Sequence, residues 1–303
     1  MDFDITFNDG LNFIIGVNGT GKTTILNLLK GLLIPSNQIS KESYCYYDYI
    51  SVECDDKGKN FVLKSTKEKE SIEITKEVNG ETISKTFYFD NPSQKDESFV
   101  HHGISYLGLD RLNNYSDDAL NNIKNTLYHF VRQNITKKNI IEKDFRDSIV
   151  ALTQQPGDKD QKLKEITEEY NKKISEINKP LTRFVDSTNL FFSEGNKVLQ
   201  VDDTGEIQII IKGVETPATI FDLSSGEKQL IIMLGHIIFD NSTVVIIDEP
   251  ELSLHLSWQY KFADALLTAN PDAQYILATH AAGIVAKKSN EQYCIDLTPK
   301  YND

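Results

Sequence analysis

A short glycine-rich loop near the start of the chain carries the residue types that bind phosphate. It reads GVNGTGKT from Gly16 to Thr23 and matches the pattern GxxxxGKT. Glycines allow the tight turn in which backbone N–H groups point inward, while Lys22 can reach the β- and γ-phosphates and the Thr23 hydroxyl can bind Mg²⁺. The loop predicts a site for ATP with Mg²⁺. The residues expected to form it are Gly16, Asn18, Gly19, Thr20, Gly21, Lys22, Thr23 and Thr24.

Two carboxylates follow an apolar segment much later in the chain. Val244 to Ile247 reads as a buried strand, and Asp248 and Glu249 come directly after it. We expect Asp248 to hold the metal through water, and Glu249 to orient or deprotonate an attacking water. A buried strand that ends in a charged turn is common by itself, so the phosphate loop upstream is what gives this pattern its weight.

A serine-rich turn lies between these two motifs. The segment LSSGEKQ, from Leu223 to Gln229, opens a helix just before the second motif. Its hydroxyl and N–H groups suit an anion at the start of a helix. Ser224 with Glu227 also fits an ordinary capping box, an alternative that this segment alone leaves open.

The pair Thr279-His280 follows an apolar segment, YILAT, that reads as another strand. A single histidine at the end of a strand is more often structural than catalytic, because its ring is readily used in packing and hydrogen bonding. Only its place after the other three motifs makes His280 a candidate for the site.

The elements around these motifs alternate between strand and helix. Leu11–Val17 reads as a strand that enters the loop, and a helix with apolar residues at helical spacing follows from Lys22 to Leu33. Asp4–Phe7 reads as a further strand, joined to Leu11–Val17 by an Asn-Asp-Gly turn. Near the other end, a helix from Glu227 to Phe239 precedes the carboxylate strand. This order predicts an α/β fold with a mostly parallel core sheet covered by helices.

The middle of the chain differs from both ends. Short segments rich in Tyr, Val, Ile and Thr between Tyr44 and Phe89 predict an antiparallel β subdomain. A polar, periodic stretch at 116–192 predicts a helical insertion, which Gln155-Pro156-Gly157 breaks into two antiparallel arms and Pro180 kinks. We therefore expect three parts, an ATPase lobe at 1–115, the insertion at 116–192 and a second ATPase lobe at 193–303.

The motifs in this order resemble those of the ABC-type ATPases, in the soluble, non-transporter branch that contains SMC, RecF and overcoming-lysogenization-defect (OLD) proteins. Members are often described as "AAA family ATPases". The likeness covers Asp2–Thr24 and Thr219–Val285. It implies that two chains sandwich two nucleotides head to tail, with the serine-rich turn as the signature motif of the opposite subunit. The residues it implies for catalysis are Glu249, Lys22 and His280, the last contacting the γ-phosphate; those it implies for the opposite subunit are Ser224, Ser225, Gly226 and Glu227.

The chain departs from that family pattern at several positions. Asp110-Arg111 stands where the family places a glutamine that senses Mg²⁺ and the attacking water. His255 lies where transporter subunits usually carry aspartate. OLD proteins also carry a nuclease domain beyond the ATPase, whereas about two dozen residues follow His280 here. We therefore expect any effector to be a separate chain.

The charge of the chain limits its partners. A formal net charge of −13 disfavours a general attraction for nucleic acid, so DNA or RNA binding would have to be local. Two basic clusters exist, but acidic residues interleave both, which favours solvated helix faces. The clusters are Lys137, Lys138, Lys143 and Arg146, and Lys162, Lys164, Lys172 and Lys173.

Neither a membrane segment nor a metal-binding cysteine pattern is evident. No window approaches eighteen apolar residues, and the first residues lack the pattern of a secretion signal. Cys45, Cys54 and Cys294 are scattered and contain no CxxC pair. We expect a cytoplasmic protein with reduced thiols and no contact with membranes.

Several functions remain open at this point. The first is an ATPase whose dimer closure controls a separate effector, such as a nuclease or other toxin, in bacterial anti-phage defence. The second is a DNA repair or recombination ATPase that binds DNA directly. The third is a nucleotide-gated scaffold with little turnover. A transporter subunit is the least favoured, and assembly beyond a dimer is also open.

Overall fold

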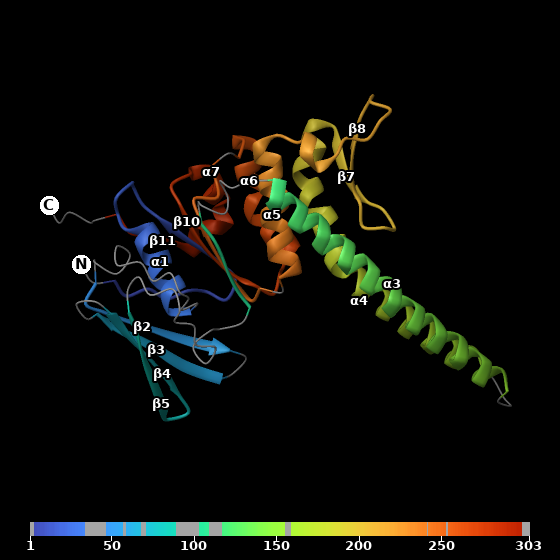
Figure 1. Cartoon of the computed structure of the whole chain (residues 1–303), viewed down its shortest axis with the longest axis horizontal. Helices are drawn as coiled ribbons and strands as arrows, with labels where there is room; N and C mark the ends of the chain where they lie inside the picture. The colour runs from blue at the N-terminus through green and yellow to red at the C-terminus, as the bar shows by residue number, and fades with distance from the viewer. Residues whose placement is uncertain are drawn as a thin grey trace. The chain divides into compact units, whose positions relative to one another are not determined.

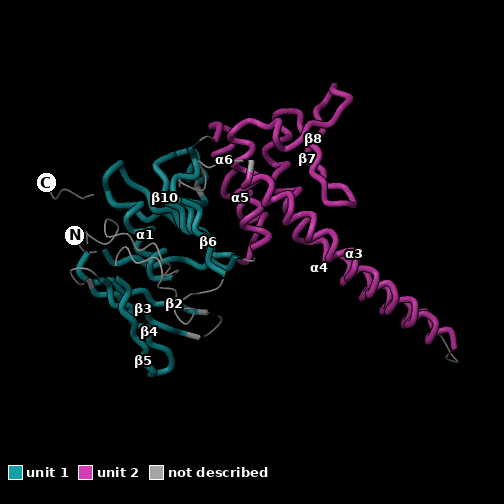
Figure 2. Tube along the Cα trace, viewed as in Figure 1, with its two compact units in different colours: residues 1–109, 242–252, 273–303 teal, residues 110–241, 253–272 magenta. Residues whose placement is uncertain are grey.

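The computed structural model describes residues 3–33, 47–56, 59–67, 71–88, 103–108, 117–154, 159–240, 242–252 and 254–298. The chain divides into two compact units, shown in Figure 2. Unit 1 contains residues 1–109, 242–252 and 273–303, and unit 2 contains residues 110–241 and 253–272. The three-part division expected from the sequence stays a prediction.

The core of unit 1 is a five-stranded sheet in the order β11-β1-β10-β9-β6. Every pairing in it is parallel. Its central strands are buried apolar segments, as expected of a parallel sheet covered on both faces. The mixed α/β fold with a parallel core is confirmed. The strands are β1 (Leu11–Ile15), β6 (Ile104–Leu107), β9 (Val244–Asp248), β10 (Gln274–Thr279) and β11 (Cys294–Asp296).

An antiparallel sheet forms the second layer of unit 1. It has the order β2-β3-β4-β5, and Asn79-Gly80, both at positive φ, form the turn between its last two strands. The antiparallel sheet predicted between Tyr44 and Phe89 is therefore present. Its strands are β2 (Tyr49–Asp56), β3 (Lys59–Lys67), β4 (Ser71–Val78) and β5 (Glu81–Tyr88).

Helix α1 (Lys22–Leu33) connects the two layers through one hydrophobic cluster. Its leucines, among them Leu26 and Leu32, are buried together with Leu63 and Ile74 of the antiparallel sheet and Ile246 of the core sheet. Figure 1 shows α1 between these sheets. The helix that follows the glycine-rich loop is thus fixed by packing on both sides. Unit 1 also contains α7 (Ala282–Val285) and the 3-10 helix η3 (Lys288–Tyr293).

Two long helices dominate unit 2. Helices α3 (Asp117–Thr153) and α4 (Asp160–Phe192) run antiparallel and side by side (Figure 1). Asn134 Nδ2 donates to the Ile177 carbonyl at 2.8 Å, and the rings of Phe145 and Tyr170 lie 4.5 Å apart between centroids. Pro180 lies inside α4, and the helix continues beyond it. The two helices occupy the region where the sequence predicts a helical insertion.

The remaining elements of unit 2 surround helix α5 (Ser225–Phe239). This apolar helix contacts α3, α4 and α6 (Leu256–Ala269), so most of its residues are buried. A hairpin of β7 (Lys197–Val201) and β8 (Ile207–Ile211) contacts the end of α4 and η1 (Ser193–Gly195) on one strand and η2 (Ile220–Asp222) on the other. Among the described helices, none has the length and hydropathy needed to cross a membrane.

The strand predicted at Asp4–Phe7 is wrong, because this segment is irregular in the structure. Strand β1 pairs with β10 on one side and β11 on the other, so it has no free edge for a further strand. The backbone of Asn8, which follows this segment, is instead hydrogen-bonded to the Asn12 side chain. Asn12 accepts from the Asn8 N–H at 2.6 Å and donates to the Asn8 carbonyl at 2.9 Å.

Candidate functional site

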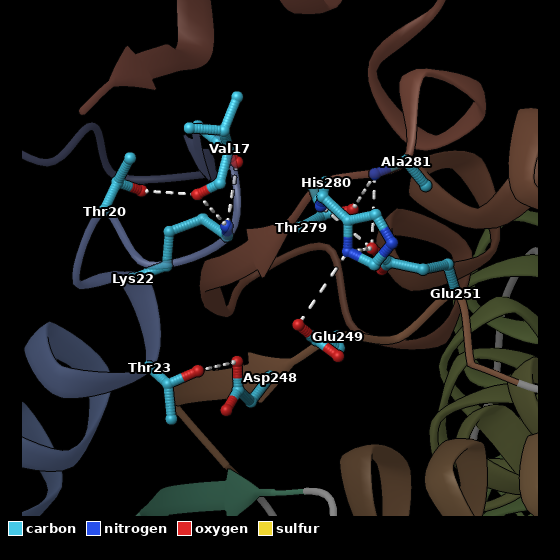
Figure 3. Close-up of polar contacts among 11 residues, drawn as sticks. Val17, Thr20, Lys22, Thr23, Asp248, Glu249, Glu251, Thr279, His280 and Ala281 are labelled. Carbon is cyan, nitrogen blue, oxygen red and sulfur yellow. Dashed lines mark hydrogen bonds and ion pairs between the residues drawn. The ribbon is translucent and has the colours of Figure 1, made fainter. Parts of the chain in front are cut away.

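The register of the core sheet brings the chemical motifs of unit 1 to one edge. Ile15 pairs with Thr279, and Ala278 pairs with Asp248. Because the three strands are parallel, the residues that follow them emerge side by side at their carboxyl ends. Figure 3 shows Lys22, Thr23, Asp248, Glu249 and His280 gathered there.

The glycine-rich loop has the conformation that its sequence requires. Gly19 and Gly21 have φ values of +88° and +95°, and a Cβ on either would meet nothing within 4 Å. A Cβ on Gly16 would lie 2.7 Å from the Thr20 hydroxyl oxygen. Gly16 also has a positive φ, of +152°, so the loop favours glycine for backbone conformation at all three positions and for space at Gly16.

Lys22 lies inside the curve of this loop. The side chain is 6% exposed, and its ammonium donates to the carbonyls of Gly16 at 2.8 Å and Val17 at 3.2 Å (Figure 3). These contacts hold the charge at the centre of the loop, and no described carboxylate forms an ion pair with it. A phosphate oxygen can replace the carbonyls as the stronger, charged acceptor.

Asp248 and Thr23 form the oxygen-rich part of the site. Thr23 Oγ1 donates to Asp248 Oδ1 at 3.2 Å, and Asp248 is 2% exposed. Burial raises the pKa of Asp248 to about 6, with the neighbouring Glu249 and Glu251 adding to the rise and Thr23 opposing it. A cation would stabilise the ionised form of this buried carboxylate. A hydroxyl beside a carboxylate also provides the oxygen ligands that Mg²⁺ prefers. These two residues fit a Mg²⁺ site.

Glu249 occupies a strained backbone position. Its φ is +47°, in the left-handed region that non-glycine residues rarely adopt, and its N–H donates to the Ala278 carbonyl at 2.8 Å. Such strain costs about 1–3 kcal/mol and concentrates at functional sites. The position carries the Glu249 carboxylate past the end of β9, where Oε1 lies 3.8 Å from His280 Nδ1.

Glu251 is a residue of the site that sequence reasoning missed. Its Oε1 accepts from the N–H groups of His280 at 2.9 Å and Ala281 at 3.2 Å, and it lies 3.1 Å from His280 Nδ1. The sequence contained one signal for it, a carboxylate three residues after Asp248 in DEPE. That signal does not reveal which backbone groups the carboxylate meets, because they come from another strand.

The serine-rich turn begins helix α5 in unit 2, whereas the residues above belong to unit 1. The capping box is present, since Glu227 Oε2 accepts from the Ser224 N–H at 2.9 Å and hydroxyl at 2.8 Å. Glu227 Oε1 lies 2.7 Å from Lys197 Nζ. Burial opposes ionisation of Glu227, but the bonds from Lys197 and Ser224 prevail and lower its pKa. Both carboxylate oxygens are therefore engaged within unit 2.

Other residues singled out in the sequence have local partners. His255 caps helix α6, and its ring accepts from the Ser257 N–H at 3.3 Å. In the basic clusters, Lys138, Lys164 and Lys173 each lie within 4 Å of a glutamate on the same helix, the shortest distance being 2.7 Å. Asp110, Arg111 and Cys45 lie outside the described residues.

Comparison with known proteins identifies the family. A family model described as "AAA domain, putative AbiEii toxin, Type IV TA system" matches residues 11–286. The Retron Vc95 probable ATPase of Vibrio cholerae serotype O1 biovar El Tor is 28% identical over 120 residues, which cover 35% of this chain and 23% of that protein. The resemblance to AAA-type ATPases that the motifs predicted is confirmed by the family match.

Two SMC head domains are among the solved structures whose backbone matches this chain. One is the Smc head domain from Pyrococcus furiosus, with an extended coiled coil, bound to the C-terminal domain of ScpA. It is 13% identical to this chain, and the match covers 93% of this chain and 86% of the Smc chain with a TM-score of 0.45. The other is the SMC head domain from Thermotoga maritima, 14% identical, covering 93% and 84%, with a TM-score of 0.45.

Asp248→Asn is expected to raise the free energy of unfolding of the nucleotide-free protein at neutral pH. The carboxyl group titrates near 3.8 when unfolded and at about 6 when folded, so the wild type loses stability as pH rises between these values. The gain of the variant should grow over that range to about 1–2 kcal/mol, allowing for solvent screening. Denaturant unfolding at several pH values measures it. The exposed Asp203→Asn is the control, and a gain that does not vary with pH would contradict the prediction.

Proposed function

Because the chain belongs to this family of AAA domains, we propose that it binds ATP with Mg²⁺, hydrolyses the ATP, and uses closure of a dimer around the nucleotide to control a partner effector. The observation that carries the proposal is the meeting of Lys22, Thr23, Asp248 and Glu249 at one edge of the core sheet. A lysine inside a glycine loop, a hydroxyl beside a buried carboxylate and a second carboxylate next to it are the parts that phosphoryl transfer to water needs.

Binding uses the glycine-rich loop and the start of α1. The loop N–H groups and the positive end of the helix receive the phosphates, and Lys22 exchanges its contacts with Gly16 and Val17 for the β- and γ-phosphate oxygens. Thr23 and Asp248 would hold Mg²⁺, Asp248 through water, and the metal would supply positive charge that stabilises the phosphate oxygens.

Hydrolysis uses Glu249 and His280. Glu249 orients a water molecule and accepts its proton while the water oxygen bonds to the γ-phosphorus and the bond to the bridging oxygen of ADP breaks. His280, 3.8 Å from Glu249 Oε1, contacts the γ-phosphate. Lys22 stabilises the charge of the departing group, and the products are ADP and phosphate.

A second copy completes the site in this proposal. Ser225 and Gly226 of the partner copy would present hydroxyl and N–H groups at the start of the 15-residue helix α5 to the γ-phosphate, while Ser224, whose N–H and hydroxyl both donate to Glu227, shapes the turn. The bonds of Glu227 to Ser224 and Lys197 support this role, because they hold the turn in place from within unit 2. Loss of the γ-phosphate removes the contact between the copies, so hydrolysis reopens the dimer.

The effector part of the proposal is supported by the names of similar proteins. The family description refers to a toxin and a type IV toxin–antitoxin system, and the Vibrio cholerae relative is a retron ATPase. These names support the proposed role in anti-phage defence, with a nuclease or other toxin as a separate partner. Direct DNA binding by α3 and α4 has less support, because basic residues there lie beside glutamates on the same helix.

Glu249→Gln is expected to lower the steady rate of ATP hydrolysis by about 100-fold or more, because the amide cannot accept the proton of the water. ATP binding should stay within about threefold of the wild type, whereas Lys22→Ala should lose most of it. Phosphate release and equilibrium binding of a labelled nucleotide measure the two effects. A Glu249→Gln variant that hydrolyses ATP at the wild-type rate would exclude Glu249 as the catalytic carboxylate.

Mixing two inactive variants is expected to restore hydrolysis. Lys22→Ala removes the phosphate lysine and Ser225→Arg blocks the partner face, so a mixed dimer contains one site with both defects and one with neither. About a quarter of the wild-type activity should return when the chains mix at random in a symmetric dimer. Each variant alone is the control. No recovery, with mixed dimers shown to form, would mean that the site is complete within one chain.

The effector is expected to associate with the closed state. Tagged Glu249→Gln, which holds ATP, should recover a second protein from the native cells, and Lys22→Ala should recover less of it because this variant cannot close. Quantitative mass spectrometry compares them, and an assay of toxin or nuclease activity on the recovered complex follows. Recovery of neither a second chain nor nucleic acid in any state would contradict this part of the proposal.

A further inference from the structure

The candidate site contains a buried carboxylate, that of Glu251, to which the proposed mechanism assigns no role. Glu251 is 7% exposed, and its side chain comes from the segment after β9. One carboxylate oxygen, Oε1, accepts two hydrogen bonds and forms an ion pair. The other oxygen, Oε2, is buried without a hydrogen-bond partner in the described part of the chain. Burying an ionisable group in this way costs free energy that packing does not return.

The contacts of Oε1 all lie where β10 ends. The N–H groups of His280 and Ala281 donate to it at 2.9 and 3.2 Å, and the Ala281 N–H is also 3.0 Å from Thr279 Oγ1. Both backbone groups lie beyond the last ladder bond of the strand. Glu251 therefore fixes the direction in which the chain leaves β10, and with it the base of the His280 side chain (Figure 3).

The same oxygen also meets the ring of His280, with Nδ1 3.1 Å from Oε1. At this ion-pair distance a proton on Nδ1 is favoured, because an unprotonated Nδ1 would turn its lone pair toward the negative carboxylate. Nε2 then remains as the ring atom that can reach a phosphate. The neutral ring with a proton on Nδ1 and the doubly protonated ring share this arrangement, whereas the neutral ring with its proton on Nε2 loses it.

We propose that Glu251 is a positioning residue that fixes both the orientation and the proton placement of His280, so that Nε2 faces the γ-phosphate. The expected effect of Glu251 on ATP hydrolysis rests on the proposed function, whereas its effect on the His280 ring does not. Glu249 cannot replace it, because Glu249 Oε1 is 3.8 Å from Nδ1 and has no recorded contact with the backbone of His280. Carboxylates that orient a functional imidazole typically change activity by about 10- to 100-fold when they are removed.

Hydrolysis by Glu251→Gln, Glu251→Asp and His280→Ala tests the effect on activity. We expect Glu251→Gln to lower kcat by about 10- to 100-fold with the KM for ATP within about twofold, since the loop that binds ATP is untouched. Glu251→Asp should recover part of the rate. Glu77→Gln, which removes a half-buried carboxylate paired with Lys64 at 2.7 Å on the antiparallel sheet, is the control and should match the wild type.

The double variant Glu251→Gln/His280→Ala separates positioning from a general structural role. A residue that acts through His280 has nothing left to position once the ring is gone, so the double variant should hydrolyse ATP within about twofold of His280→Ala. A further loss equal to that of Glu251→Gln alone would mean that the two residues act independently. That result would overturn the proposal.

Nitrogen NMR of the wild-type protein tests the proton placement without any need for hydrolysis. The signal of His280 is identified by its loss in His280→Ala among the six histidines. We expect a proton on Nδ1 in the wild type and a mixture of tautomers in Glu251→Gln. A proton on Nε2 alone in the wild type would overturn the inference even if the variants failed to fold. If the wild-type protein neither bound nor hydrolysed ATP while Nδ1 carried the proton, the proposed function would fail and the inference about the ring would stand.

Discussion

Parallel pairing of β1, β10 and β9 is the constraint on which the rest of the site depends. A parallel ladder turns every strand in the same direction, so residues that are 225 or more positions apart in sequence leave the sheet at the same edge. The strands themselves are buried and apolar. Charged side chains are therefore found only at the ends of the strands. This explains why Lys22 is supplied by the loop after β1, the carboxylates by the end of β9 and His280 by the end of β10.

The charges gathered at this edge do not balance. Asp248, Glu249 and Glu251 face Lys22 and His280, and the contacts of Lys22 are with carbonyls rather than with carboxylates. Burial raises the pKa of Asp248 to about 6, and the neighbouring carboxylates of Glu249 and Glu251 add to the rise. Mg²⁺ beside Asp248 and phosphates beside Lys22 are complementary to the two halves of this distribution, since the metal compensates the carboxylate and the phosphates compensate the ammonium.

The sequence predicted those parts of the fold and site that are local. Glycine spacing identified the loop after β1, apolar spacing identified α1, and the carboxylates after a buried segment identified the end of β9. The strand at Asp4–Phe7 was wrong because its apolar alternation says nothing about the edges of β1, which β10 and β11 already occupy. The role of Glu251 was missed for a related reason, because its partners are backbone groups that only the tertiary fold brings near. The capping of Ser224 by Glu227 was predictable as a local pattern, but the same pattern cannot show which phosphate the turn would meet.

Each half of the proposed composite site is held by contacts within its own unit. In unit 1, packing on both faces of α1 fixes the glycine-rich loop, and Glu251 fixes the end of β10. In unit 2, Lys197 and Ser224 together engage both oxygens of Glu227 and so fix the start of α5. Because neither half has to fold around the ligand, less of the binding free energy is lost in ordering the protein. In the proposed dimer, that free energy is then available to draw two copies together, and removal of the γ-phosphate is sufficient to release them.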